Sequence, residues 1–178
     1  MHGMKKITIA AAVLVVAGGI VAFRARNGFP VAPAEISYKN ISYEISGQTV
    51  TLASGYAETE AAPGSASKVT TSYFGNEAKG DFNADGLEDV AFLVTQSSGG
   101  SGTFYYAVAA LKTEGGYTGT NAILLGDRIA PQTTEFRNGK IIVNYAARKS
   151  GEPMTAAPSV GISTYLTVAN GTLVAIEK

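Results

Sequence analysis

Residues 133–145, Thr-Thr-Glu-Phe-Arg-Asn-Gly-Lys-Ile-Ile-Val-Asn-Tyr, decide the fold class of this chain. Two short runs with β-branched and aromatic residues flank Asn138-Gly139, and Asn-Gly suits a two-residue hairpin turn because both positions need a positive φ. The pattern recurs at Asn170-Gly171, between residues 164–168 and 173–176. Both segments therefore predict antiparallel β-hairpins.

Residues 27–178, called the body below, continue the same pattern of short apolar runs separated by turn residues. Further strands are expected at residues 41–45, 49–52, 68–74, 90–95 and 104–111. Only residues 61–67 and 117–125 leave room for a helical turn. No period of 20 to 50 residues recurs, which argues against a propeller or solenoid. The sequence predicts a mainly β protein, an antiparallel sandwich or a partly open barrel.

Composition excludes several classes of function. The chain has 14 basic and 14 acidic residues, but four of the basic ones lie before residue 27, so the body carries a net charge of about −4. Nucleic-acid binding needs clustered Lys and Arg and is not expected. There is no cysteine, and the only histidine is His2. Thiolate chemistry, disulfides and, in the body, histidine-based catalysis are therefore excluded.

The N-terminus predicts a membrane segment. Residues 7–23 carry no charge and are flanked by Lys5-Lys6 and by Arg24 and Arg26. Seventeen apolar residues are about the lower limit for crossing a bilayer as a helix. An uncleaved anchor is favoured over a cleaved signal, because Ile20 stands where a cleavage site needs a small side chain. We expect an N-terminal transmembrane or signal helix at residues 1–26, a linker at 27–35 and one extracytoplasmic β-domain at 36–178.

Residues 80–89, Gly-Asp-Phe-Asn-Ala-Asp-Gly-Leu-Glu-Asp, hold three of the four aspartates of the chain. Calcium prefers six to eight oxygen ligands, and side chains at alternating positions can converge on one ion. Gly86 allows the turn that points a backbone carbonyl inward. The sequence predicts a calcium site with these ligands: Asp81, Asn83, Asp85, the Leu87 carbonyl and Asp89. The alternative is an Asp-Gly turn with solvated acids, which mutual repulsion between the carboxylates disfavours.

This run resembles the D-x-[DN]-x-D-G-x-x-D calcium loops of α-integrin propeller repeats and, more loosely, EF-hand and dockerin loops. It departs from an EF-hand, because Phe92 stands at the twelfth position and strands are expected on both sides. From about Tyr56 onward, the chain also resembles a group of uncharacterised exported bacterial proteins. The motifs that carry this second resemblance are residues 73–77, 80–89, 99–106, 125–128 and 151–154. The resemblance implies export and no particular mechanism.

Other candidates have weaker patterns. Ser65 and Lys68 have the S-x-x-K spacing of penicillin-recognising enzymes without the companion motifs, and Ser101 lies in a glycine-rich loop without a base. Asp127 and Arg128 form a possible ligand-binding pair, or a surface ion pair. Three acids are candidates for a pair of catalytic carboxylates: Glu77, Asp127 and Glu152. Four tyrosines are candidates for the lining of a groove: Tyr105, Tyr106, Tyr117 and Tyr145.

The expected function follows from the membrane segment and the acidic loop. The chain is expected to be a single-pass membrane protein, or a secreted one if the segment is cleaved. Its β-domain would act as a binding or accessory module of the cell envelope, with an envelope protein or glycan as partner and calcium as a structural ion. The alternative is a carboxylate-dependent hydrolase of cell-wall or polysaccharide material.

Overall fold

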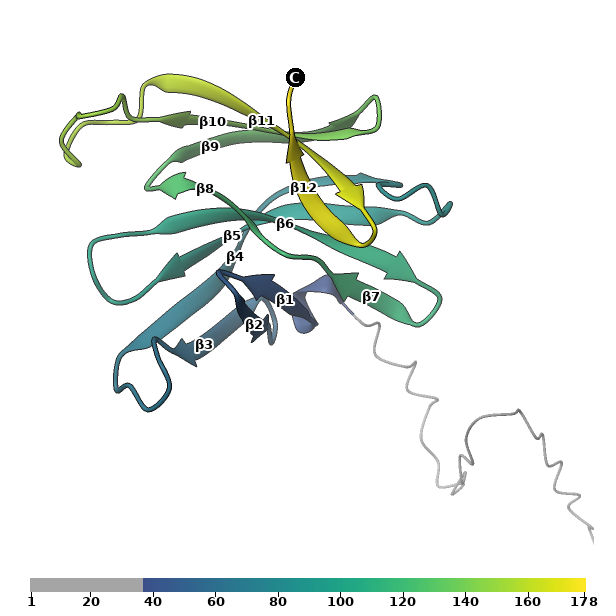
Figure 1. Ribbon diagram of the computed structural model, residues 1–178, viewed down its shortest axis with the longest axis horizontal. Coiled ribbons are helices and arrows are strands. Elements are labelled where there is room, and N and C mark those ends of the chain that lie inside the picture. Colours follow the sequence, from purple (N-terminus) through teal and green to yellow (C-terminus); the bar gives the residue numbers. More distant parts are fainter. Residues whose placement is uncertain (1–36) are drawn as a thin grey trace, which may run out of the picture. The chain divides into compact units, whose positions relative to one another are not determined.

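The computed structural model describes residues 37–178. The described residues form twelve strands and one short 3-10 helix, η1 (Tyr38–Asn40), and all strand pairs within the sheets are antiparallel (Figure 1). The predicted mainly β, antiparallel fold is confirmed. The predicted membrane segment and linker lie outside the described residues. Residues 37–178 contain no helix with the length and hydrophobicity of a membrane span.

Four strands form one sheet in the order β12-β11-β10-β9. The strands are β9 (Ala130–Arg137), β10 (Lys140–Ala147), β11 (Val160–Ala169) and β12 (Thr172–Ile176). Asn138 and Gly139 have φ values of 53° and 71°, and Asn170 and Gly171 have φ values of 51° and 74°. These positive values fit the two-residue hairpin turn that Asn-Gly favours. Both predicted hairpins are therefore confirmed.

A second sheet has six strands. Its main order is β3-β4-β5-β6-β7, and β8 also pairs with β6. The strands are β3 (Tyr56–Glu60), β4 (Lys68–Gly80), β5 (Asp89–Ser97), β6 (Phe104–Thr113), β7 (Gly116–Gly119) and β8 (Ile123–Asp127). The two sheets end in edge strands, so the fold is not a closed barrel. The β4–β5 register shifts between Tyr73 and Gly75 and again between Gly75 and Ala78.

A two-stranded ribbon, β1 (Ser42–Ile45) and β2 (Gln48–Thr51), forms a third layer. The strands expected at residues 41–45 and 49–52 are confirmed and form a hairpin, with a turn of two residues, Ser46 and Gly47, both at positive φ. Close approach to the six-stranded sheet requires Gly119, because a Cβ there would lie 2.1 Å from the carbonyl oxygen of Ser42.

The centre of the six-stranded sheet, β5 and β6, is buried on both faces. Ala91 and Leu93 of β5 face the four-stranded sheet, whereas Val90, Phe92 and Val94 face the ribbon. This explains why β5 and β6 have nearly continuous apolar sequences, without the alternation of a strand that has one wet face. The sandwich core contains Phe82, Ala91, Leu93, Ala107, Ala109, Leu111, Leu125, Ile129, Ile141, Val143, Tyr145, Leu166 and Leu173. The ribbon core contains Tyr43, Ile45, Val50, Leu52, Ala57, Val90, Phe92, Val94, Tyr106, Val108 and Ala110.

Two segments in which the sequence left room for a helical turn are not helical, and one strand was missed. Residues 117–125 form β7 and the start of β8, and residues 61–67 form turns, so neither segment is helical. Gly119 weakens a helix at residues 117–125, and pairing with β6 supplies the backbone partners of an extended chain. β3 was not predicted, because its sequence, Tyr-Ala-Glu-Thr-Glu, has little apolar character and lies at the sheet edge.

Candidate functional site

The acidic loop connects β4 to β5, with Asp81 directly after β4 and Asp89 as the first residue of β5. Gly80 precedes the loop because no side chain fits there: a Cβ would lie 2.2 Å from the Phe136 ring. Inside the loop, Ala84 and Gly86 have φ values of 62° and 86°, which turn the chain back on itself. The predicted position of the loop between two strands is confirmed.

Side-chain oxygens of the loop gather around its own backbone N–H groups. The two oxygens of Asp81 accept hydrogen bonds from the backbone N–H groups of Asp85 (3.0 Å) and Gly86 (2.9 Å). Asp85 accepts from the N–H of Leu87 at 2.8 Å and from the side-chain amide of Asn83 at 2.9 Å. Asn83 and Asp85 are exposed and Asp81 is partly buried, and their contacts hold the three side chains on one turn.

Asp89 is oriented differently from the other carboxylates of the loop. It is fully buried. Its carboxylate accepts hydrogen bonds from the backbone N–H groups of Phe82 (2.9 Å) and Lys112 (2.7 Å), so it fastens the loop to β6. Burial raises the pKa of Asp89 above its usual value, the charges of Asp85 and Asp81 add to the rise, and the two hydrogen bonds oppose it.

Within residues 37–178, no three His, Cys, Asp or Glu side chains already stand in a geometry that would hold a metal ion. The carboxylates of the acidic loop are instead occupied by N–H groups. Ion binding at this loop would require these oxygens to share or exchange their present partners. The calcium site stays a prediction.

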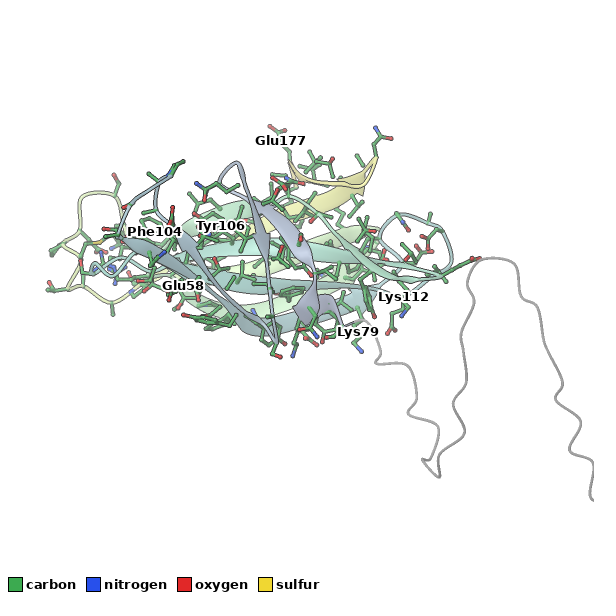
Figure 2. The ribbon with its side chains drawn as sticks, turned by 90° about the horizontal axis from the view of Figure 1, so that it is seen from below. Glu58, Lys79, Phe104, Tyr106, Lys112 and Glu177 are labelled. Carbon is green, nitrogen blue, oxygen red and sulfur yellow. The ribbon has the colours of Figure 1, made fainter. Side chains whose placement is uncertain are left out.

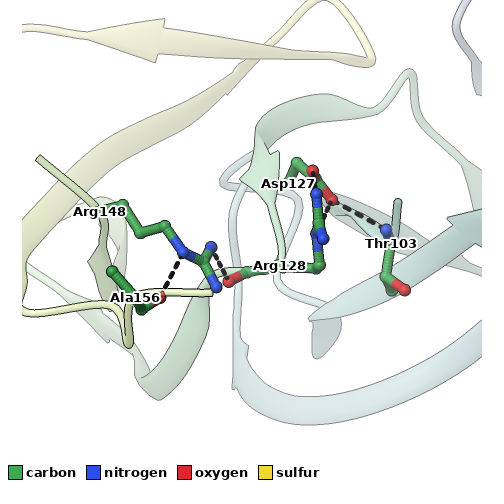
Figure 3. Close-up of polar contacts among 5 residues, drawn as sticks. All are labelled: Thr103, Asp127, Arg128, Arg148 and Ala156. Carbon is green, nitrogen blue, oxygen red and sulfur yellow. Dashed lines mark hydrogen bonds and ion pairs between the residues drawn. The ribbon is translucent and has the colours of Figure 1, made fainter. Parts of the chain in front are cut away.

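Asp127 and Arg128 bind each other (Figure 3). Arg128 Nη2 lies 2.7 Å from Asp127 Oδ2, and Arg128 Nε donates to both oxygens at 3.1 and 3.2 Å. Asp127 also accepts the backbone N–H of Thr103 at 2.9 Å. The Arg128 hydrogen bond is the main cause that holds the pKa of Asp127 below its usual value, against a smaller effect of burial. These contacts fix the β5–β6 loop to the end of β8.

Arg148 extends this arrangement and was not singled out from the sequence. Its Nε donates to the carbonyl oxygen of Ala156 at 2.6 Å, and its Nη1 donates to that of Arg128 at 2.9 Å (Figure 3). One guanidinium thus joins the β8–β9 turn to the long β10–β11 loop. Only its place after an apolar strand could have drawn attention to it in the sequence.

Glu77 lies in the irregular part of β4 and accepts hydrogen bonds from the hydroxyls of Tyr38 (2.7 Å) and Tyr73. Burial raises the pKa of Tyr38 to about 12, and the Glu77 bond adds to the rise. Burial also acts to raise the pKa of Glu77. The tyrosine bonds and the charges of Lys39 and Lys79 outweigh it and hold that pKa below its usual value. This cluster attaches η1 to β4.

The other candidates from the sequence have separate partners. Glu152 accepts the backbone N–H of Lys149 at 3.0 Å. Glu77, Asp127 and Glu152 therefore each bind different groups. Lys68 Nζ lies 3.6 Å from Glu60. Ser65 accepts the backbone N–H of Ser67, and Ser101 lies exposed in the β5–β6 loop.

The four tyrosines that the sequence suggested for a groove belong mainly to the packed interior. Tyr106 and Tyr145 are 8% and 5% exposed, and Tyr105 and Tyr117 are partly buried against the two cores. Tyr106 also lines a pocket of about 220 Å³. A second pocket, of about 350 Å³, lies between β1 and β7 beside Tyr117.

Comparisons with protein-family models, with curated proteins and with solved structures find no match to this chain.

Proposed function

We propose that this chain is an extracytoplasmic binding module of a bacterial cell envelope, held by its N-terminal segment or secreted, with a structural calcium ion in the β4–β5 loop. The observation that carries the proposal is the gathering of Asp81, Asn83 and Asp85 on one turn of the loop that ends at the buried Asp89. Three carboxylates so close in sequence repel one another, and a divalent cation would turn that repulsion into attraction.

The proposed ion would connect β4, β5 and the start of the loop. The ligands would be side-chain oxygens of Asp81, Asn83, Asp85 and Asp89 and the backbone carbonyl of Leu87. Because an ion that binds only the folded state stabilises it by mass action, calcium would raise the unfolding midpoint. An affinity on the order of 10⁻⁴ to 10⁻³ M, typical of extracellular modules, is expected.

Thermal unfolding of the full chain in millimolar calcium and in chelator tests the metal site. Calcium is expected to raise the midpoint of the wild type by a few degrees and to leave Asp81→Asn/Asp85→Asn unaffected. Glu88→Gln is the matched control, because Glu88 is an exposed acid of the same loop that pairs with Lys79 at 3.7 Å. An equal midpoint with calcium and with chelator would refute the calcium site.

The binding role and the location need separate tests. Cell fractionation should place the full chain in the membrane or outside the cell, and recovery from the cytosol would contradict export. Capture from envelope extract on the immobilised full chain, with and without calcium, should return one defined envelope component. Release of sugar or peptide products from that extract would instead support a hydrolase.

A further inference from the structure

A pocket of about 220 Å³ lies at one end of the six-stranded sheet, on the face that carries the ribbon core. Its lining comes from β4, β5, β6 and the β5–β6 loop. These residues are Val69, Gln96, Ser97, Ser98, Phe104 and Tyr106. Phe104 and Tyr106 lie close together in Figure 2, away from Lys79 and Lys112 nearer the other end of the domain.

The pocket joins an exposed aromatic ring to fixed polar groups. Phe104 is 41% exposed, directly opposite Gln96 in the β5–β6 register. Gln96 donates its amide N–H to the buried hydroxyl of Thr71 at 3.1 Å, which fixes the side chain. Among residues 37–178 no donor to the amide oxygen of Gln96 is found, so that oxygen can accept from a ligand. The hydroxyl of Tyr106 is 3.0 Å from that of Ser46, which holds this wall in place.

Charge restricts what the pocket can take. None of its six lining residues is charged at neutral pH, and the body beyond residue 26 has a net charge of about −4. An anionic polymer would meet repulsion from the body and would find no cation in the pocket to pair with. The lining therefore fits an uncharged ligand.

An uncharged sugar ring matches these groups. A pyranose presents C–H groups on its faces, which pack on an aromatic ring, and hydroxyls at its rim, which bond amide and serine groups. The volume is below the roughly 300 to 1,000 Å³ of pockets that enclose a drug-sized ligand. It suits one ring of a longer chain that continues over the surface. A second protein copy would need about 800 Å² on each partner, far more than this pocket offers.

We propose that this pocket binds a ring of a neutral glycan, with Phe104 as the stacking platform and Gln96 and the two serines as hydrogen-bonding partners. The inference rests on the proposed binding role and names the ligand class. It does not depend on the calcium ion.

Depletion of the full chain from detergent solution by insoluble chitin and cellulose tests the inference. The wild type should bind at least one of these polysaccharides. Phe104→Ala should weaken the apparent affinity about tenfold, and Phe104→Trp should retain it, because an aromatic face is what the ring contacts. Phe74→Ala is the matched control, since Phe74 is 45% exposed on the other face of the same sheet. Equal unfolding midpoints of the two alanine variants would show that folding is not the cause.

Four outcomes would overturn the glycan site. One is wild-type binding that Phe104→Ala leaves unchanged or that Phe74→Ala weakens equally. Another is retention by neither polysaccharide while the envelope capture returns a partner, which would refute the glycan and leave the proposed binding role standing. A captured protein partner that depends on Phe104 would assign the pocket to a peptide. Failure of both the depletion and the envelope capture would refute the glycan and the binding role together.

Discussion

At the scale of single residues, the hydrogen bonds of Asp89 stabilise the fold whether or not an ion is bound. It is fully buried, and its two oxygens satisfy N–H groups of Phe82 and Lys112 that would otherwise lack partners. A buried donor left unpaired costs about 1 to 3 kcal/mol. The carboxylate form also pays for its removal from water, which is why burial raises its pKa. The hydrogen bonds to the carboxylate stabilise the folded state and its desolvation destabilises it, and pH changes this balance by protonating Asp89.

Replacement of Asp89 by Asn should destabilise the fold by about 1 to 3 kcal/mol, because the amide group turns a donor toward one of the two N–H groups. Since the pKa is raised in the folded state, the native protein binds the proton more readily than the unfolded chain. The stability of the wild type relative to Asp89→Asn should therefore grow as pH falls from neutral toward the usual value of 3.8. Urea unfolding of both proteins in chelator at pH 7 and pH 4 measures this. A difference in unfolding free energy between the wild type and Asp89→Asn that is smaller at pH 4 than at pH 7 would contradict the raised pKa of Asp89.

At the scale of elements, Asn121 protects the free edge of β12. Its amide nitrogen donates to the carbonyl oxygen of Leu173 at 3.0 Å, and its amide oxygen accepts the N–H of Leu173 at 2.8 Å. The side chain thus takes the place of a neighbouring strand. An unpaired edge is a site for pairing with other chains, so this contact guards against association. The backbone around Asn121 also bonds to Glu44 of the ribbon.

Asn121→Ala should expose the N–H and C=O of Leu173 and destabilise the domain by about 1 to 2 kcal/mol. Amide hydrogen exchange is the direct measurement, because the Leu173 amide should lose its protection. Asn144→Ala is the control: the side-chain amide of Asn144 bonds side chains of the same sheet, namely Thr133, Ser163 and Glu135, and not Leu173. Unchanged protection at Leu173 in Asn121→Ala would show that the edge is covered by something else.

What the sequence could predict at this scale was local. The Asn-Gly hairpins and the turn of the acidic loop depend on neighbouring residues, so turn chemistry alone located them. β7, β8 and the long irregular β4 depend on pairing with strands far along the chain, and their own residues give a weak signal. The inward orientation of Asp89 was hidden for the same reason, because its second donor, Lys112, is 23 residues away.

At the scale of the whole molecule, three layers share one central sheet. The sandwich core and the ribbon core lie on its opposite faces, so β5 and β6 contribute buried side chains to both. Loss of the ribbon would expose Val90, Phe92 and Val94 to water. Each such side chain contributes roughly 1.5 to 3 kcal/mol when fully buried. The ribbon is therefore a necessary layer of the fold, although it has only two strands.

Gly119→Ala tests this coupling, because its Cβ would lie 2.1 Å from the Ser42 carbonyl oxygen and 2.7 Å from the Tyr43 ring. The ribbon cannot dock without a shift, and a loss of about 2 kcal/mol or more is expected in urea unfolding. Gly115→Ala, where a Cβ meets nothing within 4 Å, should unfold within about 0.5 kcal/mol of the wild type. Amide hydrogen exchange at Tyr43 and Ile45 along the same urea series reports the ribbon, and far-UV circular dichroism reports all sheets. Coincident transitions in Gly119→Ala would mean that the layers unfold together, and an unchanged midpoint would contradict the close packing of β1 on β7.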